Sequence, residues 1–295
     1  MASSTCYNLE PLANIKLHTF RFYHALTTGA KIASWLPEEA GIAGLSKTYT
    51  ALAKTLRNSI IDQFWDEDLG AFTESPKTST LHPQDANSFA LAFGVVTGTQ
   101  ADRVSDYLAS TWTPIGPSSP ELPNNISPFI SSVELHAHFQ ANRPDRALEL
   151  MRSLWGYYLT HENGTQSITP EGFLTDGSWG YRYNQGYSNG PAYMSHAHCW
   201  SSGPTSTLTE LMVGLRVTGP AGKEWALAPA TFRELTRAQA GFTTTLGKFS
   251  AKFEVRGKKV IIEWDTPEGT KGVVALPGRK AVEVRGGKGS TSVLV

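Results

Sequence analysis

The sequence is poor in cysteine: only Cys6 and Cys199 occur among its 295 residues, and they are far apart. Two isolated cysteines supply neither the ligand set of a structural zinc site nor the cross-links of a small disulfide scaffold. Long apolar runs are also missing, and no segment approaches the roughly 20 residues that cross a bilayer as a helix. We therefore expect a protein without a cysteine-rich module and without a membrane partner.

The sequence also lacks net charge, because 26 lysines and arginines balance 26 aspartates and glutamates. A dedicated nucleic-acid-binding protein needs a basic surface, so we expect no nucleic-acid partner. The first residues contain neither the basic nor the apolar stretch of a signal peptide. The default expectation is a cytoplasmic protein, or a secreted one if the chain is part of a longer precursor that carried a signal.

The two signs of charge are distributed unevenly along the chain. Residues 1–215 contain 12 basic and 19 acidic residues, whereas residues 216–295 contain 14 basic and 7 acidic residues. The pattern of apolar residues changes at the same place, from helical spacing to alternation. This coincidence predicts two domains, comprising residues 1–215 and 216–295.

The first domain has the periodicity of helices. Leu45, Tyr49, Leu52, Leu56 and Ile60, for example, recur at spacings of three or four, which is typical of an amphipathic helix. Short connections between such segments predict antiparallel helical hairpins. The expected helices cover residues 14–36, 45–64, 85–96, 99–112, a segment that begins at 128 with Ser127 as N-cap, 144–158 and 204–215.

The second domain has the alternation of strands. Phe249, Ala251 and Phe253 point to one face of the run 248–255, and the residues between them are polar. Turns rich in glycine and proline, at residues 256–258, 267–269 and 277–278, separate this run from further short ones. The pattern predicts a small antiparallel β-sandwich.

Residues 163–193 form a long stretch without helical period, and long loops inside a compact domain are often functional. The loop contains Glu171, Asp176 and Trp179, and His198 and Trp200 follow it. Aromatic rings stack on the apolar faces of sugars and carboxylates bond to sugar hydroxyls, so these side chains predict a sugar site in which one carboxylate activates water. A surface loop with incidental acidic residues is the alternative.

Three further groups of polar residues have a functional and a structural interpretation. Asp85 and Asn87, at the start of a predicted helix, either line the rim of a pocket or cap the helix. Glu134 and His138, four residues apart on a helix, are expected to form a satisfied buried pair. The pairs His136/His138 and His196/His198 lack the additional ligands of a metal site. We expect no metal and no cofactor.

Four segments, in the same order, resemble segments of the α-L-rhamnosidases of glycoside hydrolase family 78, especially the fungal ones. The tail, with Pro229 and residues 241–249, is similar to the C-terminal β-domain of these enzymes. The four segments are residues 82–90 (HPQDANSFA), 127–132 (SPFISS), 168–178 (ITPEGFLTDGS) and 195–205 (SHAHCWSSGPT).

The resemblance implies a mainly α fold with a β tail, namely part of an (α/α)6 toroid of helical hairpins followed by a small antiparallel β-sandwich. It implies hydrolysis of terminal α-L-rhamnosides with inversion, which requires a general acid and a general base. Glu171 falls on the position of the general base and His198 on that of a substrate-binding histidine. Asp85, Asn87, Asp176, Trp179 and Trp200 complete the expected substrate-binding set, and the expected partner is a rhamnose-containing glycoside.

The sequence departs from the family pattern in two places. Pro170 stands where the family has tryptophan, and the acidic segment that carries the family's general acid has no counterpart. The chain therefore corresponds to the C-terminal part of such an enzyme, and we expect weak or no activity from it alone. A non-catalytic carbohydrate-binding remnant and an unrelated helical scaffold are the alternatives. The oligomeric state is left open.

Overall fold

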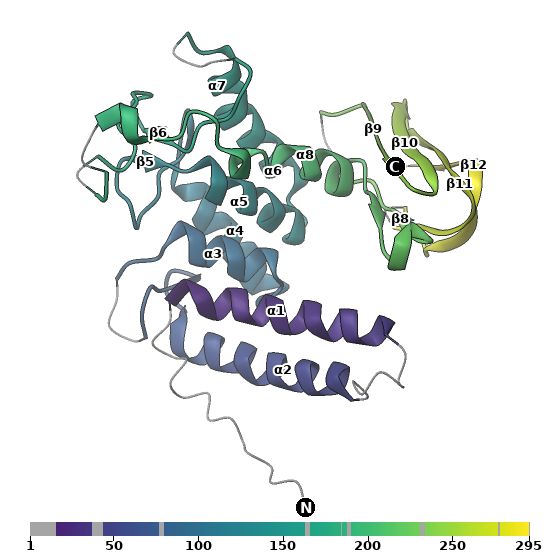
Figure 1. Ribbon diagram of the computed structural model, residues 1–295, viewed down its shortest axis with the longest axis horizontal. Helices are drawn as coiled ribbons and strands as arrows, with labels where there is room; N and C mark the ends of the chain where they lie inside the picture. The colour runs from purple at the N-terminus through teal and green to yellow at the C-terminus, as the bar shows by residue number, and fades with distance from the viewer. Residues whose placement is uncertain are drawn as a thin grey trace, which may run out of the picture. The chain divides into compact units, whose positions relative to one another are not determined.

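The computed structural model describes residues 16–36, 44–76, 80–162, 166–183, 185–187, 190–230, 234–276 and 278–294 (Figure 1). Contacts between residues divide the chain into two compact units. The first, which we call the helical unit, comprises residues 1–143 and 152–201, and the second, the β unit, comprises residues 144–151 and 202–295. The predicted domain boundary between residues 215 and 216 thus lies within the β unit and stays a prediction.

The helical unit contains the first five helices that the sequence predicts, with ends that differ by a few residues, and the end of the sixth. Three pairs of two-residue strands lie between them: β1 (Trp65–Asp66) with β2 (Ala71–Phe72), β3 (Trp112–Thr113) with β4 (Gly116–Pro117), and β5 (Asn125–Ile126) with β6 (Phe173–Leu174). The helices are α1 (Lys16–Trp35), α2 (Leu45–Phe64), α3 (Gln84–Ala92), α4 (Thr99–Ser110), α5 (Pro128–Gln140) and α7 (Tyr157–Thr160).

One predicted helix is interrupted. The segment 144–158 was expected to be continuous, but it consists of α6 (Pro144–Leu150), a π-helical turn (Met151–Gly156) and then α7. The two compact units also divide the chain at this π-helical turn. The apolar spacing of the sequence predicts the helical backbone here but not the change in its hydrogen bonding.

Helix α3 forms the centre of the helical unit. Seven of its nine residues are buried, and it packs against α1, α4, α5 and β2. Helices α1 and α2 lie side by side as a hairpin (Figure 1). The buried core that these elements share is apolar and aromatic, with Phe20, Leu56, Ile60, Phe64, Phe72, Phe89, Leu91, Val104 and Leu108 among its members. Because α3 is buried on most of its surface, its polar groups have little access to water. They need hydrogen-bond partners within the protein.

The predicted start of α5 is confirmed in its detail. Ser127 is the N-cap, its hydroxyl accepts a hydrogen bond from the Ile130 N–H, and Pro128 occupies the first turn. Helix α4, unlike α5, has a glycine, Gly98, as its N-cap, and no side chain accepts a hydrogen bond from its first turn.

The β unit contains one six-stranded mixed sheet. Its strands are β7 (Leu215–Val217), β8 (Glu224–Leu227), β9 (Arg237–Thr244), β10 (Gly247–Arg256), β11 (Lys259–Val274) and β12 (Val282–Leu294). The β8–β11 pair is parallel, which the prediction of an antiparallel fold missed. The last predicted helix, 204–215, ends early: α8 (Pro204–Ser206) continues as a π-helical segment (Thr207–Met212), and Leu215 already belongs to β7.

Strand β11 explains how one sheet encloses a core. The prediction of a turn at residues 267–269 is wrong, because these residues lie within β11, where the register with β12 shifts between Thr266 and Lys271. On one edge, β11 pairs with β10 before this irregularity and with β8 after it. Residues of both halves, including Leu227 and Phe253, share one hydrophobic cluster. Two separate sheets, as in the predicted sandwich, are therefore not confirmed.

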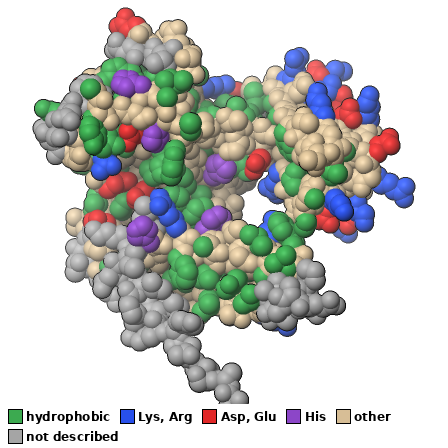
Figure 2. All heavy atoms as spheres, in the orientation of Figure 1, with side chains coloured by type: hydrophobic (Ala, Val, Ile, Leu, Met, Phe, Trp, Pro, Cys, Tyr) green, Lys and Arg blue, Asp and Glu red, His purple; other side chains and the backbone are tan. Residues whose placement is uncertain are grey.

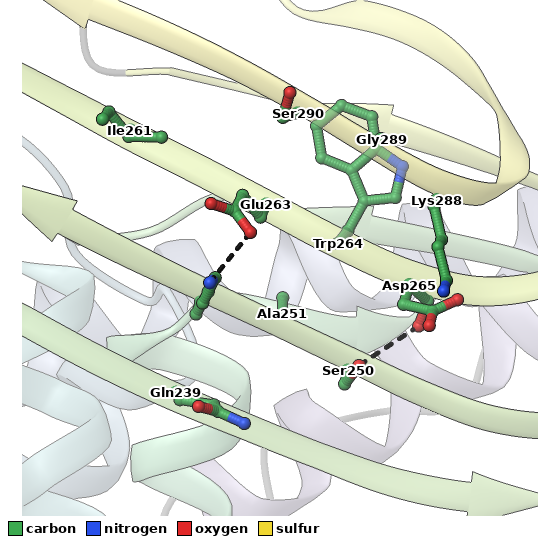
Figure 3. A pocket seen from close by; sticks show the side chains of 11 residues that line it. Gln239, Ser250, Ala251, Ile261, Glu263, Trp264, Asp265, Lys288, Gly289 and Ser290 are labelled. Carbon is green, nitrogen blue, oxygen red and sulfur yellow. Dashed lines mark hydrogen bonds and ion pairs between the residues drawn. The ribbon is translucent and has the colours of Figure 1, made fainter.

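The charge of the β unit lies on its surface. Lys and Arg side chains gather over its strands in the space-filling view (Figure 2). A shallow groove of about 630 Å³ crosses this polar face (Figure 3). Lys252 and Glu263 form an ion pair of 2.9 Å in it, and both side chains are about half exposed. Exposed pairs of this kind contribute little to stability, so the face serves mainly to keep the sheet solvated.

We expect the substitution Gly272→Ala to destabilise the β unit. A β-carbon at position 272 would lie 2.2 Å from the ring of Trp225. That ring is 1% exposed and its Nε1 donates a hydrogen bond of 3.0 Å to Thr270, so it has no room to move. The free energy of unfolding should fall by about 1–3 kcal/mol in chemical denaturation. The exposed neighbour Lys271→Ala is the control, and an equal effect of both substitutions would contradict this account of the packing.

Candidate active site

Two segments far apart in the sequence lie side by side in the helical unit and form the frame of the candidate site. The N–H of Glu171 donates to the carbonyl oxygen of Ser195 at 2.9 Å, and the N–H of His198 donates to the carbonyl oxygen of Thr169 at 2.8 Å. The hydroxyl of Thr169 also donates to the carbonyl oxygen of His198, at 3.2 Å. These bonds place the predicted base and the predicted substrate-binding histidine on neighbouring segments of the chain.

The side chain of Glu171 is fixed at both oxygens. Its Oε2 accepts a hydrogen bond of 3.0 Å from the N–H of Ser195, and its Oε1 accepts a short one from the hydroxyl of Tyr187. The strand that follows, β6, pairs with β5 through Phe173 and Ile126, which holds the backbone beyond Glu171 as well. Glu171 is therefore half-buried in a defined orientation and does not lie free in solvent.

Tyr187 is held by its neighbours. The guanidinium of Arg182 lies 5.2 Å from the centre of its ring, and the rings of Tyr193 and Tyr181 lie 5.0 Å and 6.3 Å away. The hydrogen bond to the carboxylate of Glu171, with a smaller contribution from burial, raises the pKa of Tyr187 to about 12. The proton of the phenol is thus retained for donation to Glu171 over the physiological pH range.

Of the other predicted site residues in the loop, Trp179 lies close to this frame. Its ring contacts His196, with 5.2 Å between ring centres, and Tyr158 at 5.9 Å. Asp176 is exposed, and its carboxylate accepts hydrogen bonds from the N–H and the hydroxyl of Ser178. These bonds lower the pKa of Asp176 and form a local turn. Oδ1 of Asp176 therefore accepts structural hydrogen bonds within the loop.

His198 and Trp200 form an aromatic surface. Their rings are inclined by 30°, with 6.4 Å between centres, and Phe129 at the start of α5 contacts the ring of Trp200 edge-on at 5.2 Å. Trp200 is nevertheless 67% exposed. A large exposed indole fixed by a neighbouring ring is suited to stacking on a ligand.

Asp85 belongs to a second cluster, at the start of α3. It lines a cavity of about 200 Å³ together with two other carboxyl groups, Glu74 and Glu121, and with the rings of Phe20 and Phe64. Glu121 accepts hydrogen bonds from the N–H groups of residues 84 and 85, at 2.8 and 3.1 Å, and so caps the helix from a distant loop. Burial, followed by the charge of Asp85, raises the pKa of Glu121 to about 7.

Asn87 has a structural role in this arrangement. Its side chain is fully buried, and its amide accepts from the N–H of Phe72 at 2.7 Å and donates to the carbonyl oxygens of Phe72 and Pro83. Both amide protons are therefore used, and the side chain fastens β2 to α3. The predicted role of Asn87 in substrate binding is therefore replaced by a structural one.

A third cluster is closed to solvent. Glu134 and His138 are both fully buried and form the expected pair, 3.2 Å apart, and the other ring nitrogen of His138 lies 2.9 Å from the hydroxyl of Ser105. Trp112 and Gln84 donate to the carboxylate of Glu134, at 2.6 and 2.7 Å. This serine–histidine–glutamate series has the order of a catalytic triad, but it is enclosed, so it serves to satisfy polar groups between α3 and α5.

Sequence reasoning missed two residues of these clusters. Tyr187 lies in the loop 163–193, but nothing in its spacing pointed to a bond with Glu171. Glu121 is the single acidic residue of the loop 114–125, which is the only signal that could have drawn attention to it.

The described part of the chain contains no group of three or more His, Cys, Asp or Glu residues placed to hold a metal ion. None of its helices has the length and apolar character needed to cross a membrane.

The comparisons with known proteins agree with the family resemblance. The model of the bacterial α-L-rhamnosidase C-terminal domain matches residues 214–291. The resemblance of this chain to α-L-rhamnosidases is confirmed. No curated protein matches the chain in sequence.

Solved α-L-rhamnosidase structures share the fold over most of this chain. The enzyme from Aspergillus terreus is 18% identical with a TM-score of 0.67, covering 92% of this chain and 29% of its own. A family 78 rhamnosidase from Bacillus sp. GL1 is 21% identical with a TM-score of 0.67, covering 89% and 26%. The Streptomyces avermitilis enzyme in complex with L-rhamnose is 18% identical with a TM-score of 0.65, covering 93% and 26%.

These structures show the fold and not the activity, because their identity to this chain is low. The chain also spans only about a quarter to a third of their length. The activity of the complete enzymes, their substrates and the catalytic role of individual residues are therefore matters of proposal for this chain.

We expect Glu171→Gln to lower the pKa of Tyr187 from about 12 toward its ordinary value near 10. An amide accepts a weaker hydrogen bond than a carboxylate and carries no charge to retain the phenolic proton. The ultraviolet absorbance of tyrosinate during an alkaline titration, with Tyr187→Phe to identify the signal, measures this change. Glu162→Gln, an exposed glutamate of the same unit, is the control, and an unchanged titration of Tyr187 would show that the bond does not form in solution.

We expect the stability of the protein to depend on pH through Glu121. Its pKa in the folded state is about 7, raised from 4.5, so its contribution is fully present below pH 4.5 and is lost as pH rises through 7. The difference in unfolding free energy between the wild type and Glu121→Gln should therefore change by on the order of 1–3 kcal/mol between pH 5 and pH 8, in favour of the wild type at pH 5. Denaturation curves at both values measure it. Glu149→Gln, on the exposed surface, should show no such change.

Proposed function

We propose that this protein is a glycoside hydrolase that removes terminal α-L-rhamnosyl residues with inversion, with Glu171 as the general base. The observation that carries the proposal is the fixed carboxylate of Glu171, held between Ser195 and Tyr187 on a backbone frame that also carries His198. The fold shared with solved α-L-rhamnosidases, one of them in complex with L-rhamnose, supports the choice of substrate class.

In the proposed reaction, Glu171 accepts a proton from a water molecule. The oxygen of this water forms a bond to the anomeric carbon on the face opposite the leaving group, and the glycosidic bond breaks with its electron pair on the leaving oxygen. A second carboxylic acid, roughly 6.5–9.5 Å from the first in inverting enzymes, gives the leaving oxygen its proton. Each oxygen of Glu171 accepts one hydrogen bond from the protein, which leaves acceptor capacity for the water.

Five of the substrate-binding residues that the sequence predicts have the chemistry to bind a deoxyhexose. Trp179 and Trp200 provide rings for the apolar face and the methyl group of rhamnose, and His198, Asp176 and Asp85 provide hydrogen-bonding groups for its hydroxyls. Trp200 contributes most exposed ring surface of the two, since it is 67% exposed. We assign these five residues to substrate binding.

The proposal includes the architecture of the catalytic domain. We propose that the helical unit is part of a six-hairpin (α/α)6 toroid, that the domain 1–215 ends where the β-domain 216–295 begins, and that the latter is built as a sandwich in the complete enzyme. The similarity to solved enzymes over about nine tenths of this chain and about a quarter of theirs supports this. In this proposal, the general acid is a residue other than Glu171 and the five substrate-binding residues.

The test uses a substrate that needs no general acid. The leaving group of an α-L-rhamnosyl fluoride is the fluoride ion, which departs without protonation. Hydrolysis of this substrate therefore reports on the general base alone. We expect turnover by the wild type, with β-L-rhamnose as the first product by NMR, and a loss of about 10²- to 10⁴-fold in Glu171→Gln. Glu162→Gln should have the activity of the wild type.

Three outcomes would contradict the proposal. Equal turnover by the wild type and Glu171→Gln would remove the base assignment, and α-L-rhamnose as the first product would remove inversion. Binding of L-rhamnose by calorimetry without any turnover of the fluoride would indicate a carbohydrate-binding protein instead of a hydrolase.

A further inference from the structure

We propose that Tyr187 is a positioning residue for the general base: its hydroxyl orients the carboxylate of Glu171 toward the reacting water. The inference deepens the proposed function and rests on the assignment of Glu171. Nothing in the loop sequence distinguishes Tyr187 from the three other tyrosines nearby, Tyr181, Tyr183 and Tyr193. The hydrogen bond to Oε1 of Glu171 distinguishes it in the structure.

A single backbone donor would leave the carboxylate of Glu171 able to rotate. The N–H of Ser195 bonds Oε2 at 3.0 Å, and one such contact restricts rotation about the terminal side-chain bond only weakly, because that torsion has a broad energy minimum. A second donor at Oε1 removes this freedom, because the two bonds together define the plane of the carboxylate. The plane decides which lone pairs face the substrate, and a displacement of about 1 Å at a reacting group costs on the order of 10²-fold in rate.

The position of Tyr187 is itself fixed, which a positioning residue requires. Its N–H donates to the carbonyl oxygen of Arg182 at 3.2 Å, and the N–H of Arg182 donates to the side-chain oxygen of Asn125 at 2.7 Å. The side-chain amide of Asn125 also donates to Gln185 at 3.0 Å. Because Asn125 belongs to β5, which pairs with the strand after Glu171, the tyrosine and the glutamate are attached to the same pair of strands.

The charged and titratable groups that face this pair are few among the described residues. The guanidinium of Arg182 lies over the ring of Tyr187, the phenols of Tyr181 and Tyr193 pack against its edges, and Glu171 accepts its proton. Glu121 acts on the same region through Tyr181, whose pKa is raised by burial first and, in part, by the carboxylates of Glu171 and Glu121. Removal of the Tyr187 hydroxyl alone changes only one of these interactions.

The experiment compares Tyr187→Phe with Tyr183→Phe. The first keeps the ring and its packing and removes the hydroxyl on Glu171, and the second removes an exposed hydroxyl four residues earlier in the same loop. With the rhamnosyl fluoride as substrate, we expect kcat of Tyr187→Phe to fall by about 10- to 100-fold at neutral pH with KM changed by less than about 3-fold. Tyr183→Phe should match the wild type in both.

The split between kcat and KM separates orientation of the carboxylate from a general loss of structure. A positioning role lowers kcat alone, whereas a loss of packing in the loop would raise KM as well and would lower the melting temperature of Tyr187→Phe below that of Tyr183→Phe. Unchanged kcat in Tyr187→Phe would overturn the inference, while a strong effect of Glu171→Gln would leave the proposed function intact. If Glu171→Gln itself is without effect, both are wrong.

Discussion

The burial of the first turn of α3 is the constraint on which the arrangement of the helical unit depends. The first N–H groups of a helix have no partner within it, and here they are enclosed by other elements. Glu121, from a loop more than thirty residues later, accepts from the N–H groups of Gln84 and Asp85, and the side chain of Gln84 continues to Glu134 on α5. These polar groups are buried and cannot bond to water instead. The loop before α5 is therefore held against α3.

This constraint reaches the candidate site through a series of hydrogen bonds. The loop that Glu121 anchors ends in β5, where Asn125 bonds the segment that carries Tyr187, and β5 pairs with the strand that follows Glu171. The carboxylate of Glu171 is thus positioned by elements whose own positions depend on the core around α3. The described part of this long loop holds the side chain of Glu171 in one orientation because its polar groups bond to elements that are themselves fixed.

The sequence predicts the parts of this molecule that follow from local patterns. The helix over 45–64 and the strand over 247–256 repeat their apolar residues at the expected period, and Ser127 and Pro128 mark the start of the helix over 128–140 by local chemistry. Contacts between distant segments have no such local signal. The cap of α3 by Glu121, the bond between Tyr187 and Glu171, and the passage of β11 through a predicted turn each depend on residues that only the folded chain brings together.

The contrast between Glu171 and Glu121 shows why a perturbed pKa does not by itself identify a catalytic acid. Glu121 has a pKa near 7, the value expected of a general acid, but both of its oxygens accept from helix N–H groups, and burial is the main cause of the shift. Glu171 has two donors as well, but it is only half-buried, and the backbone segment bonded to its own continues into His198 and the exposed Trp200. Access and donor geometry therefore separate the structural carboxyl group from the candidate base, and they favour Glu171 as an acceptor of protons.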